Sequence, residues 1–194
     1  MTTDAQLVQI VDRALAHATE KSGAHLVCRP GCTQCCHGAF EINALDALRL
    51  RTGMAALKSA LPAVAAQVEA RALAYLSEFA PEFPGDPVSG ILGDSDEAQA
   101  AFEDFANEAA CPALDPQSGL CDLYSARPMT CRVFGPPVRF GEEGGLAVCE
   151  LCFTTASPEE IAACEMPVPH DQEQQILDSF HDKSSTIVAF CLLP

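Results

Sequence analysis

Apolar residues recur every three or four positions along much of the chain, which is the spacing of amphipathic helices packed on a core. This spacing predicts helices over residues 3–21, 41–51 and 55–80. Gly53 is expected to weaken the end of the second of these helices, because glycine is a poor helix former. Pro62 suits the first turn of a helix, where its missing N–H group costs little.

The second half of the chain carries sharper helix-start signals. Residues 95–110 predict a helix that begins after a serine or aspartate N-cap and has acidic residues in its first turn. The sequence SPEE at 157–160 combines an N-cap serine, a proline and a glutamate three residues after the serine. A short helix is expected to begin at Pro128, and a last one to cover 171–182. The apolar segment 186–193 fits no single element type.

A clear break in the helical pattern lies at residues 80–90, which contain three prolines and two glycines. We interpret 81–94 as a linker or lid inside one domain that spans 1–194. A short hairpin is expected near 138–148. The pattern therefore predicts a mainly α single domain, in which about six helices support two cysteine-rich, metal-binding loops.

The composition narrows the classes of partner. Hydrophobic residues make up 48% of the 194 residues, which is enough for one packed core. The net charge of −16 disfavours nucleic acid as a partner, because binding to phosphates depends on Lys and Arg. No stretch reaches the ~18 apolar residues of a membrane-spanning helix, so no membrane partner is expected.

The eleven cysteines say more about function than any other feature of the composition. The N-terminal residues lack the basic and then apolar pattern of a secretory signal, so we expect a cytoplasmic protein. Thiols stay reduced in that compartment. The cysteines therefore indicate metal binding or redox chemistry more than a disulfide framework.

The densest cysteine group is the segment CRPGCTQCCH. Pro30 and Gly31 suit the two central positions of a type II turn, which would direct the thiols on either side of them toward one point. Cys32 and Cys35 have the C-x2-C spacing that lets two thiolates bind one ion. Cys36 diverges from its neighbour, so the adjacent pair favours more than one metal ion, although one member could be a buried structural thiol. The predicted ligands here are Cys28, Cys32, Cys35 and Cys36.

Two further groups follow. Cys111, Cys121 and Cys131 lie ten residues apart, a spacing that matches no standard ligand motif. Arg127 and Arg132 flank the last of these cysteines, where guanidinium groups would lower the pKa of a thiol and supply hydrogen bonds to a metal-bound sulfur.

Cys149 and Cys152 form a second C-x2-C pair, which either binds metal or acts as a redox dithiol. The redox alternative lacks the βαβ context of such motifs. We interpret Cys164 and Cys191 as buried apolar residues, and His37 as either a metal ligand or a cap of the first loop.

Taken together, CRPGCTQCCH and the later CPALDPQSGLCDLYSARPMTCRVFG resemble the YkgJ-type CxxCxxCC family of zinc- or iron-chelating proteins. Members of that family are often labelled Fe–S-cluster-containing oxidoreductases. The resemblance implies a metal-binding domain. It carries over to Cys28, Cys32, Cys35, Cys36, Cys111, Cys121, Tyr124, Arg127, Pro128, Cys131 and Arg132, and it implies that Tyr124, Arg127 and Arg132 lie around the cofactor.

Three functions from different classes fit these residues. We favour a polythiolate protein that binds iron, as an Fe–S cluster or a multi-iron site, with a redox or metal-dependent enzymatic role. The alternative is a structural or storage zinc protein with one or two four-cysteine sites, acting as an interaction module. A metal-free thiol oxidoreductase using the C-x2-C pair at 149–152 is the third. The expected partners are metal ions.

Overall fold

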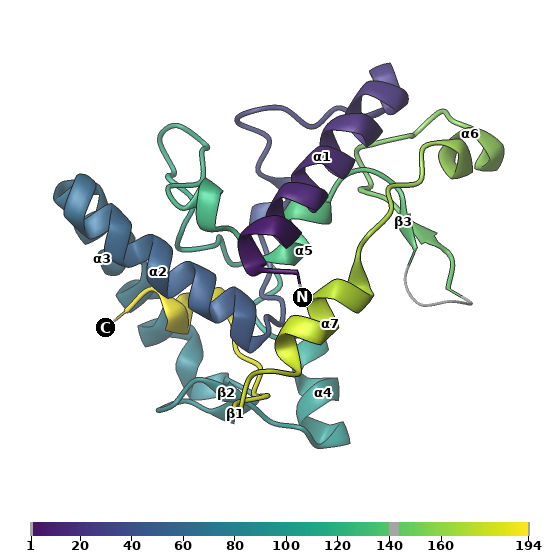
Figure 1. Ribbon diagram of the computed structural model, residues 1–194. Helices are drawn as coiled ribbons and strands as arrows, with labels where there is room; N and C mark the ends of the chain where they lie inside the picture. Colours follow the sequence, from purple (N-terminus) through teal and green to yellow (C-terminus); the bar gives the residue numbers. More distant parts are fainter. Residues whose placement is uncertain (1, 140–143, 194) are drawn as a thin grey trace. The chain divides into compact units, whose positions relative to one another are not determined.

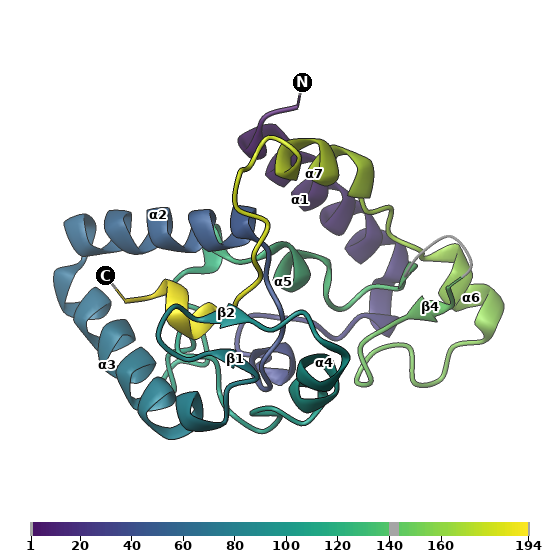
Figure 2. The same ribbon diagram turned by 90° about the horizontal axis from the view of Figure 1, so that it is seen from below.

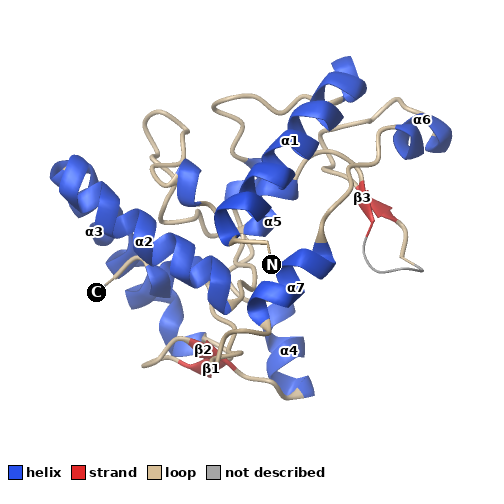
Figure 3. Cartoon of the chain, viewed as in Figure 1, coloured by secondary structure: helices blue, strands red, loops and turns tan. Residues whose placement is uncertain are grey.

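The computed structural model describes residues 2–139 and 144–193, and helices predominate in it (Figures 1 and 3). The described residues form seven α-helices and two small two-stranded sheets, which confirms the mainly α class. None of these helices is long and apolar enough to cross a membrane. The chain divides into two compact units, each described by itself below. Unit 1 comprises Met1–Arg29 and Met129–Phe180, and unit 2 comprises Pro30–Pro128 and His181–Pro194.

Unit 1 is built on the long helix α1 (Asp4–Ser22). Thr3 and Gln6 form a capping box at its start, and the buried side chains of Leu7 and Val11 lie on its inner face. Helices α5 (Met129–Val133) and α7 (His170–Leu177) pack against α1, and Figure 2 shows α7 beside it.

The rest of unit 1 consists of short elements. The 3-10 turn η1 (Gly23–His25) follows α1, and α6 (Pro158–Ala163) begins with the capping box predicted from SPEE. Strands β3 (Val138–Arg139) and β4 (Leu146–Ala147) pair antiparallel, which confirms the hairpin expected near 138–148.

Unit 2 is built on α2 (Ala44–Ala60) and α3 (Pro62–Phe79), which pack against each other. Its core contains Leu50, Met54, Val68 and, from the last segment of the chain, Leu192. The C-terminal segment enters this core through a pair of backbone hydrogen bonds between Ile42 and Thr186, and continues as the 3-10 turn η5 (Val188–Cys191). The apolar segment 186–193, which fitted no single element type, therefore packs in the core and contains a 3-10 turn but no α-helix or strand.

Shorter elements complete unit 2. They are η2 (Gln34–Cys36), η3 (Ala80–Glu82), β1 (Gly85–Asp86), β2 (Ile91–Leu92), α4 (Asp96–Glu103) and η4 (Tyr124–Ala126). The segment expected as a linker or lid, 81–94, holds most of η3 and the antiparallel β1–β2 hairpin. This hairpin is tied to the C-terminal segment, because the N–H group of Leu92 donates to the carbonyl of Ser185.

Four predicted helices have bounds that differ from those expected. The helix predicted over 41–51 continues through Gly53 to Ala60. The helix packs closely against η4 at this position. A Cβ at residue 53 would lie 2.3 Å from the Cβ of Ala126 in η4, so only glycine fits there. Its successor begins at Pro62, not at 55.

The helix predicted over 95–110 stops at Glu103. The chain then turns and passes through a left-handed conformation at Ala106, whose φ is +51°. The last helix covers His170–Leu177 in place of 171–182. Periodicity overestimated both helices, because it does not contain the turns that replace the helix near residues 105–109 and at 179–180.

Candidate metal centre

Cys35 and Cys36 lie on the 3-10 turn η2 in unit 2. The N–H group of Cys36 donates to the carbonyl of Thr33 over 2.8 Å, which closes the turn. The carbonyl of Cys36 accepts from the N–H group of Cys111 over 2.7 Å, and the N–H group of Gly38 donates to Ala109 over 2.9 Å. Backbone hydrogen bonds thus join the first cysteine group to the start of the second, about seventy-five positions away in the sequence.

Cys111 and Cys121 lie at the two ends of one tight loop. Leu114 pairs with Cys121 in an isolated bridge, and the N–H group of Leu114 donates to the carbonyl of Cys111 over 2.9 Å. Between them the Asp115 carboxylate accepts from the Ser118 hydroxyl over 2.5 Å and the Ser118 N–H group over 3.1 Å. This Asx turn brings the loop back on itself, so two cysteines ten residues apart become neighbours.

The environment of Cys35, Cys111 and Cys121 raises the pKa values of these three thiols. The Cys36 thiol hydrogen-bonds that of Cys35, and this bond together with burial raises the pKa of Cys35 strongly. Burial raises the pKa of Cys111 to about 11, and burial also raises the pKa of Cys121. Without metal Cys35, Cys111 and Cys121 are therefore thiols at neutral pH, and a bound cation would supply the charge that favours their thiolate forms.

Two arginines place positive charge in the same region. The field of Arg127 lowers the pKa of both Cys35 and Cys121, against the larger effects above. Its guanidinium carbon lies 3.9 Å from the centroid of the Tyr124 ring, and its Nη1 donates to the Tyr124 carbonyl over 2.8 Å. This contact keeps Arg127 fixed beside the thiols.

Arg71 of α3 holds the loop that follows Cys111. Its Nε donates to the Pro112 carbonyl over 2.8 Å, and its Nη2 pairs with the Asp122 carboxylate over 2.6 Å. Neither Arg71 nor Asp122 was predicted from the sequence as a site residue. Arg71 is one charged residue in a predicted helix and Asp122 is an acidic residue next to a cysteine, and both features are too common to single them out. Soft thiolates with guanidinium groups nearby are a donor set that fits zinc or an iron–thiolate centre.

A second gathering of thiols lies in unit 1. The Sγ atoms of Cys28 and Cys152 are 3.9 Å apart. Cys149, Cys152 and Cys164 are buried in one cluster with Leu26. Unit 1 also contains the half-buried Cys131 on α5.

Arg132 follows Cys131 on α5. Its buried guanidinium donates through Nη1 to the two carboxylate oxygens of Asp12, over 2.8 and 3.1 Å. This contact joins α5 to α1. The predicted role of Arg132 around a cofactor stays a prediction.

The remaining predicted residues are distributed as follows. Cys32 belongs to unit 2, where it is half-buried. The Nδ1 atom of His37 lies 3.0 Å from the carbonyl of Thr33, so this ring caps the first loop through that nitrogen. Cys191 lies in the core of unit 2, as expected of a buried apolar residue.

Among the described residues, no three His, Cys, Asp or Glu side chains are already arranged as a complete metal site. The full ligand set named from the sequence therefore stays a prediction. What the structure adds is the backbone pairing of residues 36–38 with 109–111 in unit 2 and the thiol cluster in unit 1.

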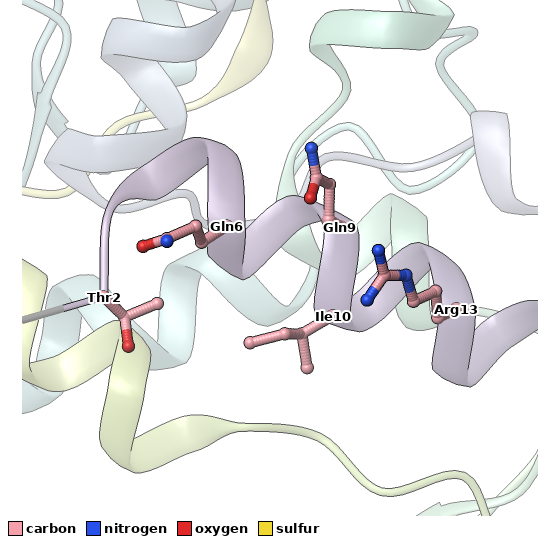
Figure 4. A pocket seen from close by; sticks show the side chains of 5 residues that line it. All are labelled: Thr2, Gln6, Gln9, Ile10 and Arg13. Carbon is pink, nitrogen blue, oxygen red and sulfur yellow. The ribbon is translucent and has the colours of Figure 1, made fainter.

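A cavity of about 940 Å³ in unit 2 reaches the cysteine region. Cys111 and Arg71 contribute to its wall, together with the aromatic side chains of Tyr75 and Phe79. Burial raises the pKa of Tyr75 to about 12, with a smaller contribution from Cys111. A smaller hollow on α1, shown in Figure 4, is lined by Thr2, Gln6, Gln9, Ile10 and Arg13 and contains no cysteine.

The thiol-rich loops define a metal-binding protein, and a comparison with protein families identifies which one. The chain belongs to the CxxCxxCC family, described as a putative zinc- or iron-chelating domain, whose model matches residues 27–153. The match spans every predicted cysteine ligand from Cys28 to Cys152 and ends before Cys164. No curated protein and no solved structure matches the chain.

Proposed function

We propose that this protein is a polythiolate iron protein that holds an Fe–S cluster or a multi-iron site and has a redox or metal-dependent enzymatic role. The observation that carries the proposal is the proximity of two cysteine pairs in unit 2, Cys35–Cys36 and Cys111–Cys121, supported by the hydrogen bond between Cys111 and Cys36. Four cysteines are the ligand number that Fe–S clusters typically take.

The residues around these pairs support a redox role. Fe–S potentials depend on net charge, on hydrogen bonds to sulfur and on burial. Arg127 offsets the negative charge of thiolates at Cys35 and Cys121, and the half-buried position of all four cysteines limits contact with water. Iron would supply electron transfer or Lewis acidity, and the protein residues would hold and insulate it.

An enzymatic role also needs space for a substrate. The 940 Å³ cavity beside Cys111 provides this space, and its wall combines aromatic side chains with the charged Arg71, Glu78 and Glu82. We further propose a cytoplasmic location, because eleven free thiols are compatible with a reducing compartment.

Zinc is the second candidate metal, since the family description names zinc beside iron and thiolates bind both. A zinc protein of this kind would be a structural or storage module. Its four-thiolate sites would be closed and would have no position for a substrate.

Anaerobic purification followed by metal analysis and absorption spectroscopy tests the proposal. A brown protein with iron and a thiolate-to-iron band near ~400 nm is expected. Cys121→Ser should lose the band, whereas Cys191→Ala, which removes a buried thiol from the core, should keep it. A colourless protein with stoichiometric zinc and no iron would contradict the iron proposal.

A further inference from the structure

The cavity of about 940 Å³ in unit 2 has an aromatic wall. It is lined by residues of α3, of α4 and of the chain between positions 104 and 116, all of which belong to unit 2. The ring of Phe79 lies 4.8 Å from that of Tyr75 and 6.4 Å from that of Phe105, measured between centroids. These three rings offer a connected apolar surface to the body of a small-molecule ligand.

The charged side chains of the same wall are mostly acidic. Arg71 also lines the cavity, but its guanidinium already donates to the Pro112 carbonyl and pairs with the Asp122 carboxylate. No residue in the described part of the chain forms an ion pair with the acidic side chains of the wall. The cavity therefore has a negative potential that favours cations. Its carboxylates are those of Glu78, Glu82, Asp104 and Glu108.

The Tyr75 hydroxyl is a polar group of this wall that has no partner in the protein. Tyr75 is 8% exposed and packs against Phe79. Its hydroxyl forms no hydrogen bond with the residues that the structure describes, yet its oxygen is not sealed off from solvent. The open side of this oxygen therefore faces the cavity that Tyr75 lines. Because buried polar groups are nearly always hydrogen-bonded, the free hydroxyl indicates a ligand that completes it.

The segment that carries two of the four acids is held in place by backbone hydrogen bonds. The Ala106 carbonyl accepts from the N–H group of Ala109 over 3.0 Å, and the Ala109 carbonyl accepts from the N–H group of Gly38 over 2.9 Å. Asp104 and Glu108 lie on either side of Ala106. The wall is thus preformed, which lowers the entropic cost of binding.

We propose that this cavity binds a small organic cation, an ammonium group carried on an apolar body. The body packs on the aromatic rings, which also attract the positive charge through their faces. The ammonium group donates to the Tyr75 hydroxyl and is neutralised by the carboxylates of the wall. Because Cys111 lines the same cavity, the proposal names the substrate class of the proposed function, and it rests on that function only in treating the ligand as a substrate.

Three fluorescent probes that differ only in charge test the proposal. Each carries a dansyl group on an alkyl chain, and the chain ends in an ammonium group, a methyl group or a carboxylate. Fluorescence anisotropy follows their binding to the full, anaerobically purified chain. The ammonium probe should bind at least about tenfold more tightly than the neutral probe, and the carboxylate probe more weakly than either. The preference should shrink as the salt concentration rises.

Two variants of α3 locate the site. Ala74→Trp places an indole in the cavity from an exposed position and should abolish binding of the ammonium probe. Leu73→Trp is the matched control, because Leu73 is exposed on the same helix and does not line the cavity. Tyr75→Phe removes only the hydroxyl and should weaken binding of the ammonium probe about threefold to tenfold, as for the loss of one hydrogen bond.

A pair of double variants separates the cavity from the overall negative charge. Glu78→Gln with Glu82→Gln should weaken binding of the ammonium probe at least about tenfold. Glu20→Gln with Glu41→Gln changes the net charge equally at exposed positions outside the cavity and should leave the affinity unchanged. Equal losses in the two double variants would show attraction to the acidic surface as a whole and would overturn the site.

The iron band, recorded on the same samples, distinguishes this proposal from the iron proposal. A chain that has the band and binds the ammonium and neutral probes equally, or not at all, would overturn the ligand class alone. A chain that binds the ammonium probe selectively but lacks iron would contradict the iron proposal and leave the cation site standing.

Discussion

Arg127 shows how one side chain can adjust a thiolate site. Its charge favours the thiolate forms of Cys35 and Cys121, which burial and a neighbouring thiol disfavour. Ligand thiols must lose their protons to bind metal, so removing this charge should weaken metal binding at neutral pH. Arg127→Met is expected to lower the metal affinity about tenfold, as for other residues that support ligands indirectly.

Competition with a chelator at several pH values measures this effect. The loss should shrink as the pH rises, because the thiols then ionise without help from Arg127. Arg127→Lys keeps the charge and should recover part of the affinity. An affinity for metal that is unchanged in Arg127→Met would contradict a role of this charge in metal binding.

Tyr75 offers a pH-dependent signal from inside unit 2. Burial raises its pKa to about 12, so in the folded protein the phenol stays protonated at a pH where an ordinary tyrosine ionises. Only two tyrosines are present. In Tyr124→Phe, the tyrosinate absorbance should therefore stay low at pH 11 while circular dichroism still reports the folded chain. The same variant in denaturant should ionise at the ordinary pH.

The raised pKa of Tyr75 also makes the stability of the folded protein depend on pH. The unfolded chain loses the phenol proton first, so the contribution of Tyr75 to stability is complete below pH 10 and is lost as the pH rises toward 12. Tyr75→Phe should flatten this part of the stability curve. Full ionisation at pH 10 in the folded Tyr124→Phe protein would contradict the buried position of Tyr75.

At the scale of elements, α2 and η4 meet at Gly53. A Cβ there would lie 2.3 Å from the Cβ of Ala126, which can move only with its backbone. Gly53→Ala gains about 0.5–1 kcal/mol of helix propensity. It loses about 1–3 kcal/mol through overpacking. The packing effect is the larger one, so the variant should be less stable by about 1–2 kcal/mol.

Urea unfolding followed by circular dichroism measures this difference. Gly145→Ala is the matched control, because a Cβ at that position meets nothing within 4 Å and its φ is unremarkable. The control should be neutral. A Gly53→Ala protein that is more stable than the unmodified chain would mean that helix propensity outweighs the contact with Ala126.

Helix starts that carry a capping motif were predictable from the sequence because capping is local, whereas the start predicted at 55 was wrong, since α3 begins at Pro62. Ser157 and Glu160 form the expected capping box, and Pro62 lies in the first turn of α3. Helix ends were less predictable. Whether the helix passes Gly53 depends on Ala126, more than seventy positions away, and no periodicity contains that information.

The cysteine groups also show that contacts between segments distant in sequence could not be predicted. The cysteine motifs indicated a metal-binding protein, which the family match supports. They did not indicate that Cys164 packs with Cys149 and Cys152, because eleven residues, including the helix α6, separate it from Cys152. The close approach of Gly135 to Cys28 was equally hidden, since it depends on a contact between segments distant in sequence.

At the scale of the whole molecule, charge and metal binding are linked. The net charge of −16 destabilises a compact chain through self-repulsion, and bound cations reduce it. Ionised thiols would add further negative charge, which Arg127 offsets in part and a bound metal would offset more fully. Metal removal should therefore lower the stability of the protein as well as free its thiols.

The central claim is that Cys35, Cys36, Cys111 and Cys121 bind metal together. A mass-spectrometric map of cysteine alkylation, made on the anaerobically purified chain before and after treatment with a chelator, tests it most directly. We predict that these four cysteines are protected at first and become reactive together once the metal is removed, while the core residue Cys191 stays unreactive as long as the fold persists. Equal reactivity of the four cysteines before and after chelation would contradict the account.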